Sequence, residues 1–192
     1  MTPLSHCRLD ILTPIHKGLR LVMFDAAAKV GRADFTDDGD RTSTEHAVAA
    51  CLALLGEHAL NEDRYLSPLL AHVAPPLADI MAVEHPRLEQ AARDLSRLWP
   101  RFKAVDDDAR VQLGVELAQR LDLLVAQHLR HMTWEEQEVN AALWAGVNDA
   151  ELAAIVARVA ADTGPAHMRE WNQIVFAAAN PQEREGRESH LG

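Results

Sequence analysis

The sequence predicts an all-α protein, and three observations indicate this class. Ala and Leu are abundant, whereas aromatic residues make up only 5% of the 192 residues, a composition that favours helix over sheet. Apolar residues recur at steps of three and four in several long segments, as in amphipathic helices. Capping residues, prolines and glycines separate these segments. We therefore expect four long helices packed as an antiparallel up-and-down four-helix bundle, followed by one or two short C-terminal helices.

The first two helices are predicted on either side of an acidic loop. The first covers about residues 9–30 and ends at Gly31, before the polar stretch 34–40. The second begins at the capping box Thr42-Ser43-Thr44-Glu45, whose side chains can satisfy free backbone N–H groups. It ends before Pro75-Pro76, because proline cannot continue a helix without losing a backbone hydrogen bond.

The third and fourth helices have similar signals. The third begins at Pro75-Pro76, and we expect a kink at Pro86 and a break at Trp99-Pro100. The three acidic residues Asp106–Asp108 then provide an N-cap and a first turn that suit the positive end of a helix dipole. The fourth helix follows over about residues 109–145 and is the longest periodic segment of the chain.

We expect one domain, with the bundle over about residues 8–147 and a helical extension over about 148–180. The extension begins with Asn148 as a cap and Glu151 at the third position, and a last helix is expected over 165–178. The polar tail 181–192 is expected to fray.

Charge and hydropathy exclude several classes of partner. A formal net charge of −10 disfavours binding to nucleic acid or to an anionic membrane surface. No apolar run approaches the ~20 residues that span a bilayer, and no N-terminal stretch has the layout of a signal peptide. A cytoplasmic location is therefore the expectation.

The placement of histidines and glutamates predicts a metal site. The second and fourth helices each carry a His and a Glu four residues apart, hence on one helix face. The first and third helices each carry a histidine among apolar residues. Each feature alone is more typical of a core residue or a surface pair, but together they form a set typical of a metal site in a bundle core. The set is His16, His58, Glu62, His85, His131 and Glu135.

The spacing also predicts that these residues share one layer. His16 and His58 lie equally far from the loop between their helices, so antiparallel pairing brings them to one depth. Glu62 and His85 differ in depth by less than one turn, or about 4.5 Å at ~1.5 Å per residue. The midpoint between His85 and His131 falls in the acidic connection before the fourth helix.

The ordered set His16, His58-Ala59-Leu60-Asn61-Glu62, His85 and His131-Met132-Thr133-Trp134-Glu135-Glu136 resembles the hemerythrin-like (HHE cation-binding) family, over about residues 10–145. The resemblance implies an antiparallel four-helix bundle around a non-haem centre of two iron ions with an oxo or hydroxo bridge. It implies that the six residues are iron ligands and that Glu62 and Glu135 are bridging carboxylates. Another divalent metal is an alternative, because affinity order and availability decide which metal binds.

The sequence departs from the oxygen-carrying members of that family. These have a second histidine on the third helix where this chain has Glu89, so Glu89 is a further candidate ligand. They also place the last carboxylate five residues after the histidine, which would select Glu136 in place of Glu135. Tyr65 and His128 are candidates for a hydrogen bond to the ligands or for the pocket wall. Packing is the alternative for Tyr65 and an outward, solvated position is the alternative for His128.

The resemblance implies a protein that binds or senses oxygen, nitric oxide, iron or redox status, and we prefer this interpretation to an enzyme. One alternative is a di-iron redox enzyme that acts on peroxide or nitric oxide, or an iron donor in iron–sulfur repair. Another is a helical interaction module without a functional metal. The expected partner is a small diatomic ligand, and a protein partner or a homo-oligomer is left open.

Overall fold

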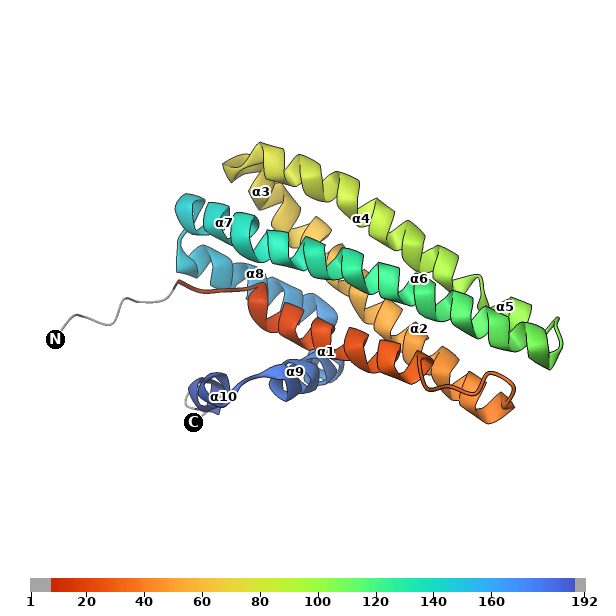
Figure 1. Ribbon diagram of the computed structural model, residues 1–192. Coiled ribbons are helices and arrows are strands. Elements are labelled where there is room, and N and C mark those ends of the chain that lie inside the picture. Colours follow the sequence, from red (N-terminus) through yellow and green to blue (C-terminus); the bar gives the residue numbers. More distant parts are fainter. Residues whose placement is uncertain (1–7, 189–192) are drawn as a thin grey trace.

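The computed structural model describes residues 8–188, which are helical throughout apart from short connections, without a strand among them (Figure 1). The predicted all-α class is therefore confirmed. The elements are α1 Thr13–Val30, α2 Asp38–Asn61, a π turn Glu62–Leu66, α3 Ser67–Val73, α4 Pro75–Ser96, α5 Trp99–Phe102, α6 Asp107–Trp134, a π turn Glu135–Val139, α7 Asn140–Gly146, α8 Asp149–Thr163, α9 Pro165–Ala178 and α10 Pro181–Glu188.

The four long helices α1, α2, α4 and α6 lie side by side (Figure 1). Helix α1 contacts α2 and α6, and α4 contacts the same two helices. The chain continues from α2 through the first π turn into α3, and from α6 through the second π turn into α7, so these segments form two long helical rods.

Two clusters of buried apolar residues fill the space between these helices. The larger cluster includes Leu19, Leu55 and Met132, and the smaller one includes Leu12 and Leu66. The chain runs from Leu12 of the smaller cluster along α1 to Leu19 of the larger one, and it returns along α2 and the first π turn from Leu55 to Leu66 of the smaller cluster. Helix α4 repeats the change from Met81 to Leu95, and the rod of α6 and the second π turn repeats the reverse change from Leu124 to Val139. Neighbouring helices therefore run in opposite directions, and the polar residues between the two clusters share one layer.

Several helix ends follow the predicted caps. The Asp106 carboxylate accepts a hydrogen bond from the Ala109 N–H at the start of α6. Asn148 and Glu151 form the predicted capping box at the start of α8. Helix α4 ends before Trp99, as expected, and Pro86 lies in its interior.

Three predicted boundaries were wrong. Helix α2 begins at Asp38, because the carboxylate of Asp37 accepts a hydrogen bond from the Asp40 N–H one turn before the expected capping box. Helix α1 begins at Thr13, since the carboxylate of Asp10 accepts from the Thr13 N–H.

The third correction concerns the C-terminal end. Residues Pro181–Glu188 form α10, where a frayed tail was expected, and residues 189–192 of that tail lie outside the described residues. The Glu183 carboxylate of this helix lies 2.6 Å from the Lys17 ammonium of α1.

The C-terminal helices pack against one side of α1. Helix α9 lies along α1, and α8 contacts both α9 and the first π turn. The Glu57 carboxylate of α2 accepts a hydrogen bond from the Trp171 indole N–H and lies 2.6 Å from the His167 ring. Within residues 8–188, no helix has the length and apolar character needed to cross a lipid bilayer.

Candidate metal centre

The structure brings all six predicted ligands into the polar layer between the two apolar clusters. Five of them are at most 5% exposed, and His58 is 13% exposed. The histidines come from α1, α2, α4 and α6, and each glutamate is the first residue of a π turn. Such a concentration of buried ionisable side chains is rare unless the groups are paired or hold a metal.

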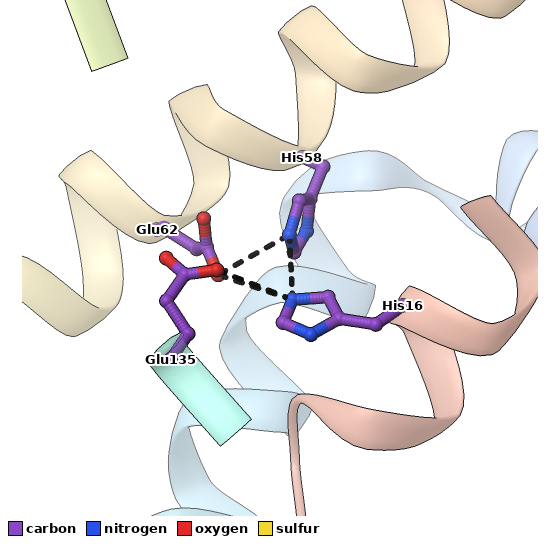
Figure 2. A group of neighbouring side chains, drawn as sticks. All are labelled: His16, His58, Glu62 and Glu135. Carbon is purple, nitrogen blue, oxygen red and sulfur yellow. Dashed lines mark hydrogen bonds and ion pairs between the residues drawn. The ribbon is translucent and has the colours of Figure 1, made fainter. Parts of the chain in front are cut away.

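The ligand atoms form two groups that share both glutamates. One group contains His16, His58, Glu62 and Glu135 (Figure 2), and the other contains His85, His131 and the same two glutamates. Within each group the atoms lie within 4.8 Å of one another.

Each of the two carboxylates directs one oxygen to the first group and its other oxygen to the second group. Oε1 of Glu62 lies 3.2 Å from His58 Nε2, and its Oε2 lies 3.6 Å from His85 Nε2. Oε2 of Glu135 lies 3.5 Å from His16 Nε2, whereas its Oε1 lies 3.1 Å from His131 Nε2. This is the disposition expected of carboxylates that bridge two metal ions.

The distances between the histidines fit metal coordination. A metal–nitrogen bond is ~2.1 Å long, so two ligands of one ion lie ~3.0 Å apart at right angles and ~3.4 Å apart in a tetrahedron. The two Nε2 atoms of His16 and His58 are 3.0 Å apart, and those of His85 and His131 are 3.1 Å apart. The right-angled arrangement, found in octahedral sites, fits both pairs.

The donor set also fits a pair of cations chemically. All four carboxylate oxygens of Glu62 and Glu135 are buried and accept no hydrogen bond among the described residues. A buried carboxylate oxygen without a partner is costly, and a metal ion would remove that cost. Imidazole and carboxylate together suit iron, zinc or manganese.

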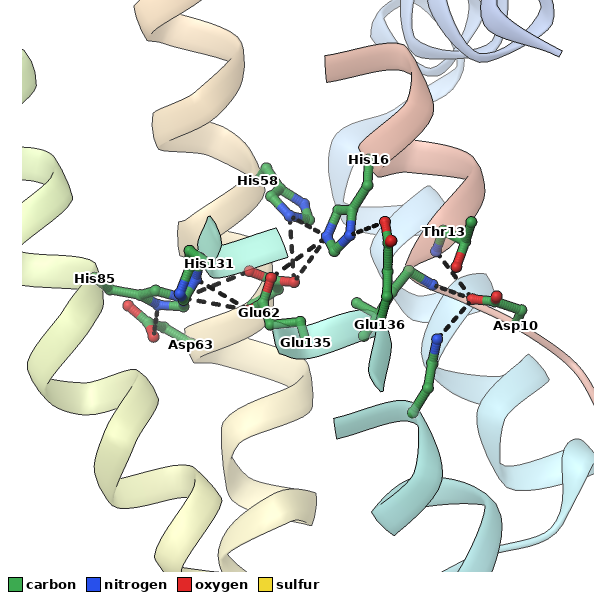
Figure 3. Close-up of polar contacts among 12 residues, drawn as sticks. Asp10, Thr13, His16, His58, Glu62, Asp63, His85, His131, Glu135 and Glu136 are labelled. Atoms are coloured by element: carbon green, nitrogen blue, oxygen red, sulfur yellow. Dashed lines mark hydrogen bonds and ion pairs between the residues drawn. The ribbon is translucent and has the colours of Figure 1, made fainter. Parts of the chain in front are cut away.

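Three carboxylates outside the layer orient the imidazoles, and Figure 3 shows two of them, Asp63 and Glu136. Nδ1 of His16 donates to Glu136 at 3.0 Å, and Nδ1 of His85 donates to Asp63 at 2.7 Å. Nδ1 of His131 donates to Glu84 over the same 2.7 Å. Because an ionised carboxylate can only accept, each Nδ1 carries a hydrogen, and Nε2 is the nitrogen that faces the interior and could bind a metal ion once any proton on it is displaced.

Electrostatics differ among the interior groups. Burial alone would lower the pKa of His16, but the facing Glu136 and Glu62 carboxylates raise it to about 9. Burial likewise opposes protonation of His85, and neighbouring carboxylates raise its pKa to about 9. Burial lowers the pKa of His58 well below its usual range.

The two shared glutamates shift in opposite directions. Burial and the adjacent Glu135 raise the pKa of Glu62 to about 7. Burial would raise the pKa of Glu135 as well, but His131 and His85 beside it lower it. The metal-free cluster therefore holds protons that bound cations would displace.

The structure places the other candidate residues away from the two groups. Glu89 is 65% exposed and forms an ion pair with Arg93, so it does not join the buried carboxylates. Glu136 binds His16 and Arg20 from outside the layer. The Tyr65 hydroxyl donates to Asp162 of α8.

His128 is buried on α6 but belongs to neither ligand group. Burial lowers its pKa to about 4, so its ring is neutral at pH 7. The outward, solvated position is therefore excluded, and the ring lines a cavity that also reaches His85.

Sequence reasoning missed two features of this centre. Asp63 and Glu84 were not identified, although each directly follows or precedes a predicted ligand. The two π turns were also missed. In each of them a backbone N–H bonds to a carbonyl five residues earlier, from Ser67 to Glu62 and from Asn140 to Glu135. Such turns insert one extra residue into a helix and are frequent at functional sites.

Comparison of the chain with models of known families, with curated proteins and with solved structures gave no match.

Proposed function

We propose that this chain is a hemerythrin-like, antiparallel four-helix bundle that holds two iron ions and binds a small diatomic ligand, oxygen or nitric oxide. The observation that carries the proposal is the pair of ligand groups that share Glu62 and Glu135, with one oxygen of each carboxylate directed to each group. Four helices that alternate in direction around this layer also support it.

Different residues of the chain would have different roles in such a centre. His16 and His58 would hold one ion, His85 and His131 the other, and the two glutamates would bridge them. Bound iron would supply redox chemistry, because iron can change its oxidation state when it binds oxygen or nitric oxide. The apolar clusters on either side of the layer would exclude water, which strengthens the interaction of the carboxylates with the cations.

A small cavity beside the centre supports a small apolar ligand. It has a volume of about 160 Å³ and borders His58 and Glu62. Its wall is mainly aliphatic, and an apolar wall of this kind suits a small apolar molecule. Residues of the segment before α1, of α1, of α8 and of α9 contribute, among them Ile11, Ile15, Ile155, Val159 and Met168.

The test is the metal content of the protein purified without oxygen. We expect about two iron ions per chain, one for each ligand group. The double variant His16→Ala with His58→Ala should retain about one ion, held by the second group. His46→Ala is the matched control, because His46 is exposed on the same helix as His58 and should leave the metal content unchanged. Iron well below one ion per chain in the wild-type protein would contradict the proposal.

The optical spectrum then separates binding from catalysis. A near-ultraviolet spectrum that shifts reversibly with oxygen or nitric oxide, without turnover, supports the binding function. Sustained consumption of peroxide or nitric oxide that is lost in His58→Ala and His131→Ala would instead establish the enzyme alternative.

A further inference from the structure

A second, larger cavity lies between α2 and α4. Its volume is about 520 Å³, within the range of small-molecule binding sites. His85 and His128 line its buried part, and the exposed residues Gly56, Arg93 and Arg97 line its mouth. It is separate from the small cavity beside His58 and shares no lining residue with it.

His128 is the unusual residue of this cavity. Its side chain is only 7% exposed, yet it joins neither ligand group and has no hydrogen-bond partner among the described residues. The four candidate ligand histidines, in contrast, direct Nε2 into the ligand groups. Its ring nitrogens are not among the fully buried side-chain atoms without a partner, so those of His128 stay accessible through the cavity that the ring lines and are free to hydrogen-bond an occupant of it.

Much of the cavity wall is apolar, with side chains from both helices that include Leu52, Leu55, Ala59, Pro86, Leu88 and Ala92. The charged lining residues Asp63, Glu89, Arg93 and Arg97 are each paired with another side chain. His128 is therefore the lining group left to hydrogen-bond an uncharged molecule, and a mainly apolar wall with a few polar groups is the usual composition of such a site.

Gly56 provides independent support. Glycine in the interior of a helix is less favourable than alanine, so a packing requirement normally accounts for it. At Gly56, however, a Cβ atom would meet no heavy atom within 4 Å. No neighbour requires the glycine, and its absent side chain leaves the mouth of the cavity open.

We propose that the cavity between α2 and α4 binds a small uncharged organic molecule, with an apolar body against the aliphatic wall and a hydroxyl group that hydrogen-bonds His128. This proposal goes beyond the diatomic ligand of the metal centre. Since His85 and its partner Asp63 also line the cavity, the occupant would lie against a metal ligand.

The probe for the test is 4-fluorophenol, followed by fluorine NMR, with binding to fluorobenzene as the comparison. We expect saturable 1:1 binding with a Kd of about 1 mM for a molecule of this size. Gly56→Leu should weaken binding at least about 10-fold, because its side chain fills the open mouth. Ala50→Leu adds the same side chain at an exposed position of α2 and should leave binding unchanged.

A second pair of variants tests the hydrogen bond. His128→Leu should weaken the binding of 4-fluorophenol roughly 2- to 10-fold, with little effect on fluorobenzene. His128→Gln keeps a polar group and should restore the preference for the phenol. The titrations are run on both metal-loaded and chelator-treated protein, so failure of the metal proposal would not obscure the result.

Three outcomes would overturn the proposal. The first is the absence of saturable binding, which would mean that water fills the cavity. The second is equal binding by the wild type and Gly56→Leu, which would place the probe elsewhere, such as the small cavity beside His58. The third is an unchanged phenol preference in His128→Leu.

Discussion

At the scale of single residues, three of the four candidate ligand histidines are oriented by carboxylates that lie outside the polar layer. Asp63, Glu84 and Glu136 each accept a hydrogen bond from the Nδ1 atom of one histidine. Such a partner fixes the ring's orientation and makes its other nitrogen more basic. His58 has no such carboxylate partner among the described residues, and the ring is the most exposed of the four.

We predict that Glu84→Gln weakens metal binding at the His131 position. The amide keeps the shape of the side chain but removes its charge, and loss of such a partner typically costs 10- to 100-fold in metal affinity. The measurement is competition for zinc or iron(II) with a chelator of known affinity. Glu89→Gln is the control, because Glu89 lies on the same helix but is exposed. Equal affinities for the two variants would show that Glu84 does not support the ligand.

The spacing of His and Glu was enough to predict which residues share the layer, because i and i+4 positions lie on one face. The same rule did not succeed for Glu89. Four residues advance a helix by a full turn plus about 40°, and at Glu89 this offset leads to the exposed edge, where Arg93 binds it. Glu84 could not be predicted either. It precedes His85 in the sequence, but its hydrogen bond crosses to His131 on another helix.

At the scale of the elements, the two π turns are the feature that sequence could not reveal. Each begins at the glutamate of a His–Glu pair and inserts one extra residue into the helix. Helix ends were easier to predict because a cap such as Asn148 acts through local hydrogen bonds. The start of α2 was missed because Asp37 competes with a capping box a turn later.

We predict that deleting Gln137 is tolerated, whereas deleting Gln127 is not. Gln137 is exposed within the second π turn, so its loss lets the turn close into regular α-helix while both flanks keep their buried faces. Gln127 is exposed within the regular part of α6, and its loss rotates every later residue by about 100°. Thermal unfolding should stay cooperative for the first variant and be lost for the second.

The same pair of deletions tests what the π turn does for the centre. Because Glu135 is the first residue of the turn, closing it displaces the carboxylate that both ligand groups share. Metal affinity of the Gln137 deletion should therefore fall at least about 10-fold although the protein stays folded. Unchanged affinity would assign the π turn to packing alone.

At the scale of the whole molecule, the ligand layer separates two apolar clusters and links all four long helices. Without cations, the four oxygens of Glu62 and Glu135 accept no hydrogen bond among the described residues and are balanced only by the nearby imidazoles. The metal-free state therefore loses stability where an ordinary core would gain it. Each bound ion would connect residues of three helices, since each group combines two histidines with both glutamates.

We therefore predict that metal binding raises the stability of all four helices together. A free metal concentration 100 times the Kd adds about 2.7 kcal/mol to the free energy of unfolding, and in a chain of this size 1 kcal/mol shifts Tm by about 2–4 °C. A chelator should thus lower Tm by about 5–10 °C, and hydrogen exchange should increase in α1, α2, α4 and α6 alike. His16→Ala with His58→Ala should lose part of this shift, because the His85–His131 group still binds. The two glutamates connect both ligand groups, so release of the ions should increase hydrogen exchange in every helix that supplies a ligand. A chelator effect confined to one helix, or no effect at all, would show that the layer is not held by metal.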